Sequence, residues 1–150
     1  MEGFERIDPI HTTFKHPFTM IVSGSTGSGK SEWVKKFLNN LTEMVTGDKT
    51  ITRVIAIDFR RFDGGIDQRL IDTVFTRGSH NWGVSVILIT QHLFSKELRI
   101  PRNNSHYLLL MRNPAGHCKL ELWLPNSFHH AQSISWKHML MQQRKHLDIY

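Results

Sequence analysis

Residues 18–31 read Phe18-Thr19-Met20-Ile21-Val22-Ser23-Gly24-Ser25-Thr26-Gly27-Ser28-Gly29-Lys30-Ser31. The first five form a short β-prone apolar run, which is typical of a buried strand. A loop rich in serine and glycine follows at once. After the loop, apolar residues recur at steps of three and four, which predicts an amphipathic helix over roughly residues 31–45. This stretch therefore predicts a strand, a glycine-rich loop and a helix in direct succession.

The loop satisfies the pattern G-x-x-x-x-G-K-[ST] without a departure, from Gly24 through Ser25, Thr26, Gly27, Ser28, Gly29 and Lys30 to Ser31. Glycines let successive backbone N–H groups turn inward around an anion, and the amino end of the following helix adds partial positive charge. In such a loop Lys30 reaches the β- and γ-phosphates, and the hydroxyl of Ser31 is a ligand of Mg²⁺. The sequence therefore predicts a P-loop that binds a nucleoside triphosphate, ATP, together with Mg²⁺.

Apolar runs alternate with helical patterns along the rest of the chain. The expected elements are strands at Val54–Ile57, Val84–Thr90 and Tyr107–Met111, helices at 66–76 and near Phe94–Leu98, and, where the pattern weakens, a strand at Leu120–Leu124 and a helix at Ile134–Arg144. Parallel strands need crossover connections of about a dozen residues, so this alternation favours a parallel sheet covered on its faces. We expect an α/β fold, a three-layer α/β/α P-loop NTPase with a short, mostly parallel sheet.

Length and composition bound the class of protein. At 150 residues the chain suits one domain, with residues 1–16 as a polar lead-in and residues 17–150 as the P-loop domain. Its longest apolar runs fall short of the ~20 residues that a membrane-spanning helix needs. The amino terminus does not resemble a secretory signal, and the single Cys118 cannot form an internal disulfide. We therefore expect an intracellular protein that is not secreted and makes no membrane contact.

The chain is basic, with 19 Lys and Arg against 13 Asp and Glu and a net charge of +6. The excess lies mainly in Arg99–Arg112 and in the segment Lys137–His146. A local basic face of this kind is compatible with a polyanionic partner such as nucleic acid.

Three further residues are candidates for nucleotide chemistry. Asp58 closes the apolar run at 54–57 and fits a carboxylate near Mg²⁺, because ligand crevices of open α/β sheets lie at the carboxyl ends of strands. Gln91 ends the next expected strand and fits a γ-phosphate sensor or a residue that positions water. Arg77 can supply positive charge to a transition state in a neighbouring subunit. Each also has a plain alternative, with Asp58 capping a turn and the other two solvated at the surface.

The order of these motifs resembles the HerA/FtsK-type packaging ATPases of Polinton-like and adintovirus-like DNA elements. The likeness spans about residues 15–115 and fades beyond them. It rests on His16–Gly24 running into the P-loop, Trp33, Phe75–His80, Ile89–Phe94 and Asn104–Tyr107 with Arg112–Pro114. The resemblance implies an ATP-driven ring of identical subunits that moves double-stranded DNA, typically into a capsid, with Arg77 acting on the adjacent subunit. Implied partners are DNA, further copies of the chain and capsid proteins.

Two departures from the family pattern leave hydrolysis open. Family members usually close this strand with two acidic residues, whereas Phe59 follows Asp58 and the next acid, Asp63, lies five positions on. The expected general base is therefore missing. Asp58 follows Lys30 by only 28 positions, so a strand-helix unit of such motors is absent. A non-enzymatic nucleotide- or DNA-binding remnant and a small P-loop kinase stay as alternatives, the latter without a recognisable lid or acceptor motif.

Overall fold

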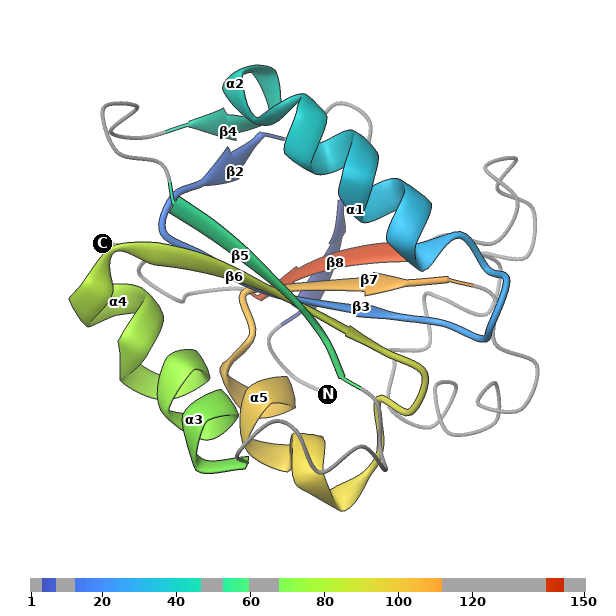
Figure 1. Ribbon diagram of the computed structural model, residues 1–150, viewed down its shortest axis with the longest axis vertical. Helices are drawn as coiled ribbons and strands as arrows, with labels where there is room; N and C mark the ends of the chain where they lie inside the picture. Colours follow the sequence, from blue (N-terminus) through green and yellow to red (C-terminus); the bar gives the residue numbers. More distant parts are fainter. Residues whose placement is uncertain (1–3, 8–12, 47–52, 60–67, 112–139, 145–150) are drawn as a thin grey trace.

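The computed structural model describes residues 4–7, 13–46, 53–59, 68–111 and 140–144 (Figure 1). Its strands are β1 (Phe4–Ile7), β2 (Phe14–Lys15), β3 (Thr19–Ser23), β4 (Val45–Thr46), β5 (Arg53–Asp58), β6 (Val84–Thr90), β7 (Tyr107–Leu110) and β8 (Leu140–Arg144). Its helices are α1 (Lys30–Asn39), α2 (Leu41–Met44), α3 (Gln68–Thr73), the π-helical turn η2 (Val74–Gly78), α4 (Ser79–Trp82), the 3-10 turn η3 (Lys96–Leu98) and α5 (Arg99–Asn104).

Six strands form one sheet in the order β1-β8-β7-β3-β6-β5. The four strands β7, β3, β6 and β5 run parallel, whereas β8 is antiparallel to β7 and β1 is antiparallel to β8. Strands β2 and β4 make a separate parallel pair. The α/β class and the mostly parallel sheet predicted from the alternation are therefore confirmed.

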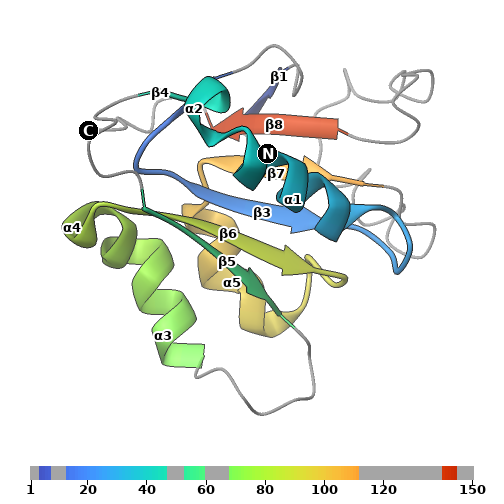
Figure 2. The same cartoon turned by 45° about the horizontal axis from the view of Figure 1, so that its top comes forward.

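The two central strands, β3 and β6, are buried along their whole length. Near-continuous apolar runs of this kind belong to strands that are covered on both faces. Figure 2 shows the covering layers, with α1 on one side of the sheet and α3, α4 and α5 on the other. The loop that joins β3 to α1 therefore starts from a fully buried strand.

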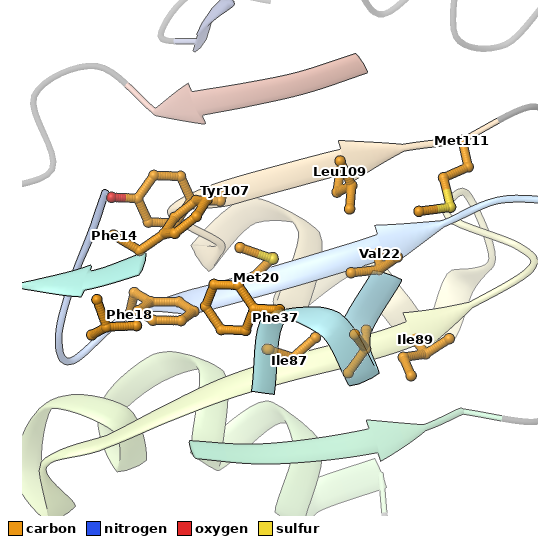
Figure 3. Packing of buried hydrophobic residues seen from close by; sticks show 12 residues of the cluster. Phe14, Phe18, Met20, Val22, Phe37, Ile87, Ile89, Tyr107, Leu109 and Met111 are labelled. Carbon is orange, nitrogen blue, oxygen red and sulfur yellow. The ribbon is translucent and has the colours of Figure 1, made fainter. Parts of the chain in front are cut away.

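Aromatic side chains fix α1 over the sheet (Figure 3). The ring of Phe37 meets those of Phe14 and Phe18 edge-on, with centroids 5.4 and 6.0 Å apart, and Tyr107 meets Phe14 at 4.9 Å. Edge-to-face pairs of this kind contribute about 0.5–1.5 kcal/mol beyond the area that they bury. The helix that begins at the loop is thus held in place from its second turn, where Val34 and Phe37 are buried.

The opposite face of the sheet has its own apolar cluster, here called the lower cluster. It joins Ile71, Val74 and Phe75 of α3 and η2 to buried strand residues such as Leu88 and Leu108. Leu98 at the end of η3 is also buried there. The helices of this layer are therefore anchored by the same central strands that support the loop.

Several predicted boundaries differ from the structure. The helix expected over Ile134–Arg144 is wrong for residues 140–144, which form β8 because they pair on both sides, with β7 and β1. The residues read as a polar lead-in include β1 and the buried Phe14, so the fold extends into them. The helix expected over 31–45 breaks at Asn40, and the one near Phe94–Leu98 continues as α5. The strand expected at Leu120–Leu124 lies outside the described residues.

Candidate phosphate-binding site

The loop of residues 24–29 leaves the carboxyl end of β3 and enters α1 at Lys30. Gly29 caps α1 with a φ of 91°, and Gly27 has a φ of 77°. Both lie in the left-handed region that glycine adopts without steric cost and other residues adopt rarely. The predicted succession of strand, glycine-rich loop and helix is confirmed.

Gly24 occupies the narrowest point of the loop. A Cβ at this position would lie 2.5 Å from Ser28 Oγ and 2.8 Å from Met111 Cβ. The backbone is pinned on both sides here, since Gly24 N donates to Thr90 O (3.2 Å) and Met111 N donates to Ser23 O (2.7 Å). A close approach of this kind requires glycine.

The ammonium of Lys30 lies against its own loop. Its Nζ donates to the carbonyl oxygens of Gly24 and Ser25, at 2.8 Å each. Burial lowers the pKa of Lys30, and the negative charge of Asp58 partly opposes that shift. The lysine and the carboxylate therefore interact electrostatically although they come from different elements.

Asp58 ends β5, which is separated from β3 by β6 and does not lie directly beside it. Its register partner is Ile89 on β6, which belongs to the apolar cluster beneath α1. Residues paired across neighbouring strands share a face of the sheet, so Asp58 faces the α1 side. Ser31 is exposed in the first turn of α1. The two predicted Mg²⁺ ligands are therefore on the same side of the sheet, and both are exposed to solvent.

Phe59, which follows Asp58 where the resembled family usually has a second acid, is partly buried and packs against the core. Its N–H donates to Ile89 O at 2.8 Å, and its ring packs against the lower cluster. The Phe59 side chain therefore lies on the face of the sheet opposite to α1. Asp63 lies outside the described residues.

Gln91 reaches the loop from the end of β6. Its Nε2 donates to Thr26 Oγ1 at 2.8 Å, so the structure brings this predicted residue to the loop. Arg77 is different, because it is exposed on η2, seven positions before β6 begins. That is the end of β6 opposite to the loop, and the structure does not bring Arg77 to Lys30 within one chain.

Met111 is a residue of this site that sequence reasoning missed. It lies just beyond β7, is buried, and receives the hydroxyl of Ser28 at its sulfur at 4.0 Å. Its apolar pattern predicts only a strand end. Met111 reaches the loop because β7 pairs with β3. The spacing of apolar residues along the sequence does not reveal which strands are neighbours.

Two features are absent from the described part of the chain. It holds no group of three or more His, Cys, Asp or Glu side chains arranged for a metal ion. No helix within it has the length and apolar character needed to cross a bilayer. Comparisons with protein-family models, curated proteins and solved structures found no match.

Proposed function

We propose that the chain binds ATP with Mg²⁺ in the loop of residues 24–31. The observation that carries the proposal is the position of Lys30, whose ammonium lies across the loop and donates to two of its carbonyls. The loop has room only for glycine at position 24, and the positive φ angles at positions 27 and 29 favour glycine. Asp58 and Gln91, from two other strands, interact with the same loop and its lysine. Convergence of a cation, a carboxylate and an amide on one glycine-rich turn supports a phosphate site.

Each residue has a defined task in this proposal. The loop N–H groups and the amino end of the ten-residue helix α1 hold phosphate oxygens. Lys30 exchanges the neutral carbonyls of Gly24 and Ser25 for those oxygens, because its positive charge is attracted more strongly by a negatively charged phosphate than by a neutral carbonyl. Ser31 and Asp58 supply oxygen ligands of the kind that Mg²⁺ prefers, and their exposure leaves room for its water ligands. The bound ion would neutralise charge on the phosphates.

The proposal extends to ATP hydrolysis that drives the movement of double-stranded DNA, as the resemblance implies. Gln91 is the residue for orienting the attacking water. Arg77 is the residue for stabilising charge in the active site of an adjacent subunit. Its place at the far end of β6 supports a role between subunits over a role within one chain. A ring of identical subunits would satisfy this requirement.

One observation favours a second candidate, a nucleotide-binding protein with impaired hydrolysis. Phe59 packs into the lower cluster, and an apolar ring cannot take a proton from water. Rapid hydrolysis in this family pattern depends on a carboxylate next to the one that binds Mg²⁺. In this chain Gln91 would have to position water without that help.

Thermal unfolding with increasing ATP and Mg²⁺ tests binding. At a ligand concentration one hundred times Kd the native state gains about 2.7 kcal/mol, which for a domain of this size raises Tm by roughly 5–10 °C. Lys30→Ala abolishes the rise, whereas Lys36→Ala, which removes an exposed lysine from the same helix, retains it. A wild-type Tm that ATP and Mg²⁺ leave unmoved refutes the proposal.

Single-turnover hydrolysis separates the motor from the impaired protein. Phosphate release that duplex DNA stimulates, and that Lys30→Ala removes, supports the motor. ATP binding without phosphate release supports the second candidate. Transfer of phosphate to a small acceptor instead of water contradicts both and indicates a kinase.

A further inference from the structure

Strand β5 forms one edge of the six-stranded sheet (Figure 2). It pairs with β6 on one side, and among the described residues no strand follows on the other side. None of its six residues is buried, although the central four, Val54–Ile57, are apolar. Ile55 is 49% exposed, whereas every residue of the neighbouring β6 is buried. An apolar edge of this kind is a template on which a further strand can pair.

The backbone groups of β5 alternate in direction along the strand. Phe59 N–H donates to Ile89 O of β6 at 2.8 Å. The N–H and C=O of one residue point to the same side of a strand, and those of the next residue point to the other side. The odd-numbered residues of β5 therefore present their backbone groups to β6. The backbone groups of Val54 and Ala56 point to the outer edge.

The side chains of β5 alternate between the two faces of the sheet. Ile57 packs against the lower cluster, and Val54 packs against the apolar cluster beneath α1. Because side chains two positions apart share a face, Ile55 lies on the same face as Ile57, and Ala56 lies on the same face as Val54. The exposed Ile55 is therefore on the side of the sheet that α3, α4 and α5 cover.

We infer that the outer edge of β5 pairs, in the antiparallel direction, with β5 of a second copy of this chain. The strand begins with Arg53 and ends with Asp58, and both are exposed. Antiparallel pairing sets the basic end of each strand beside the acidic end of the other. Parallel pairing would set equal charges side by side, which is unfavourable. The charges at the two ends thus make the strand complementary to itself.

The register of the pair follows from the side chains. Directly opposed side chains lie on the same face of a sheet, so the axis of a symmetric pair passes between a residue and its own copy. An axis at Ile55 sets Ile55 against Ile55 and lets Val54 and Ala56 of the two copies exchange backbone hydrogen bonds. An axis at Ala56 would instead set the charged Asp58 against Val54. The axis at Ile55 is therefore favoured.

This contact closes with two copies, because the same edge is used by both. It is distinct from the head-to-tail contact of a ring, in which different surfaces of neighbouring subunits meet. The interface is one short strand, so we expect a weak dimer that forms as the protein concentration rises. The inference does not depend on nucleotide binding, and a failure of either proposal leaves the other standing.

Sedimentation equilibrium of the full chain over roughly 1 µM to 1 mM, the range in which weak complexes dissociate, tests the pairing. The average mass should rise from 17.5 kDa toward twice that value. Ile55→Lys sets two ammonium groups against each other at the axis and should abolish the rise. A wild type that stays monomeric over the whole range, or a variant that associates like the wild type, overturns the inference.

Two further variants separate the strand edge from general stickiness. Ile100→Lys makes the same substitution at an isoleucine of α5 that is 42% exposed, and it should keep the rise in mass. Ala56→Pro removes an N–H that points outward and none that points to β6, so it should abolish association while thermal unfolding shows a folded chain. Loss of association in Ile100→Lys as well would overturn the inference.

A cysteine at the axis tests the register with a milder substitution, and it decides the question if Ile55→Lys fails to fold. In a Cys118→Ser background, Ile55→Cys places two thiols on a pair whose Cα atoms lie about 4.5 Å apart, within the roughly 4.4–6.8 Å that a disulfide spans. Oxidised glutathione should then give several-fold more covalent dimer than with Ala56→Cys in the same background. Equal yields from the two variants would contradict the register and overturn the inference.

Discussion

Gly24→Ala adds a single methyl group where the loop has no space for it. The new Cβ would stand 2.5 Å from Ser28 Oγ and 2.8 Å from Met111 Cβ, well inside the ~3.5–4.0 Å at which carbon atoms pack best. The Ser28 hydroxyl can rotate away. Met111 Cβ cannot, because it is attached to backbone that donates to Ser23 O at 2.7 Å. The loop itself therefore has to move.

Overpacking of this kind costs about 1–3 kcal/mol. For a domain of this size 1 kcal/mol corresponds to roughly 2–4 °C in Tm, so we expect Tm to fall by about 2–12 °C. Because typical domains have about 5–15 kcal/mol of stability, the variant should remain folded. The displaced loop should also lose the rise in Tm that ATP and Mg²⁺ produce.

Gly27→Ala is the matched comparison. No atom lies within 4 Å of its added Cβ, but its φ of +77° carries a cost of about 1–2 kcal/mol for a residue with a side chain. Combining Gly24→Ala with Ser28→Ala then tests which neighbour limits Gly24. The Met111 contact persists in that double variant, so Tm should recover only in part.

Thermal unfolding of these variants with and without ATP and Mg²⁺ tests both the loss of stability and the loss of the ATP-induced rise in Tm. A Gly24→Ala protein with the wild-type Tm and response to ATP would refute the packing described around the loop. Full recovery in the double variant would show that Met111 does not limit position 24.

Three other predictions concern the core, the lysine and the loop contact. Phe37→Ala removes a buried aromatic ring and should lower the free energy of unfolding, measured with urea, by about 3–5 kcal/mol. A decrease below about 1 kcal/mol would contradict the central position of Phe37 in the core. Because the pKa of Lys30 is lowered in the folded chain, its contribution to stability rises with pH between the lowered and the ordinary value. Asp58→Asn should lower the pKa of Lys30 further, which widens the pH range over which stability rises. The pKa is measured by NMR titration of isotope-labelled lysine, and an unchanged or higher pKa in the variant would contradict the interaction between Lys30 and Asp58. Gln91→Ala removes the side-chain hydrogen bond to Thr26 and should accelerate amide exchange several-fold at Ser28, whose N–H donates to Ser25 O within the same loop. Unchanged exchange would show that the Gln91 bond does not hold the loop.

Local signals predicted the centre of this fold well. The motif at 24–31 sets glycine where backbone angles or close contacts demand it, so the loop and the start of α1 follow from neighbouring residues alone. The buried strands β3 and β6 were equally visible, because a continuous apolar run of that length needs cover on both faces. Their parallel arrangement followed from the helices between them.

Contacts between distant segments were not visible in the same way. The pairing of residues 140–144 with β7 and β1 reverses a helical prediction, because strand formation depends on partners more than on intrinsic preference. Met111 lies beneath Gly24 only because β7 is the neighbour of β3. Asp58 was predicted as a partner of the loop, but β6 stands between the two strands, and the electrostatic influence on Lys30 acts across it.

The short connection after β6 has tethers at both ends. Gln91 is bonded to Thr26 of the loop, and two residues later the carbonyl of Leu93 is bonded to Arg102. A displacement of Thr26 by an arriving triphosphate would therefore pull on the support of Arg102 through only a few covalent bonds. Through these two hydrogen bonds a movement of the loop would be passed on to Arg102, which lies in the layer on the other side of the sheet.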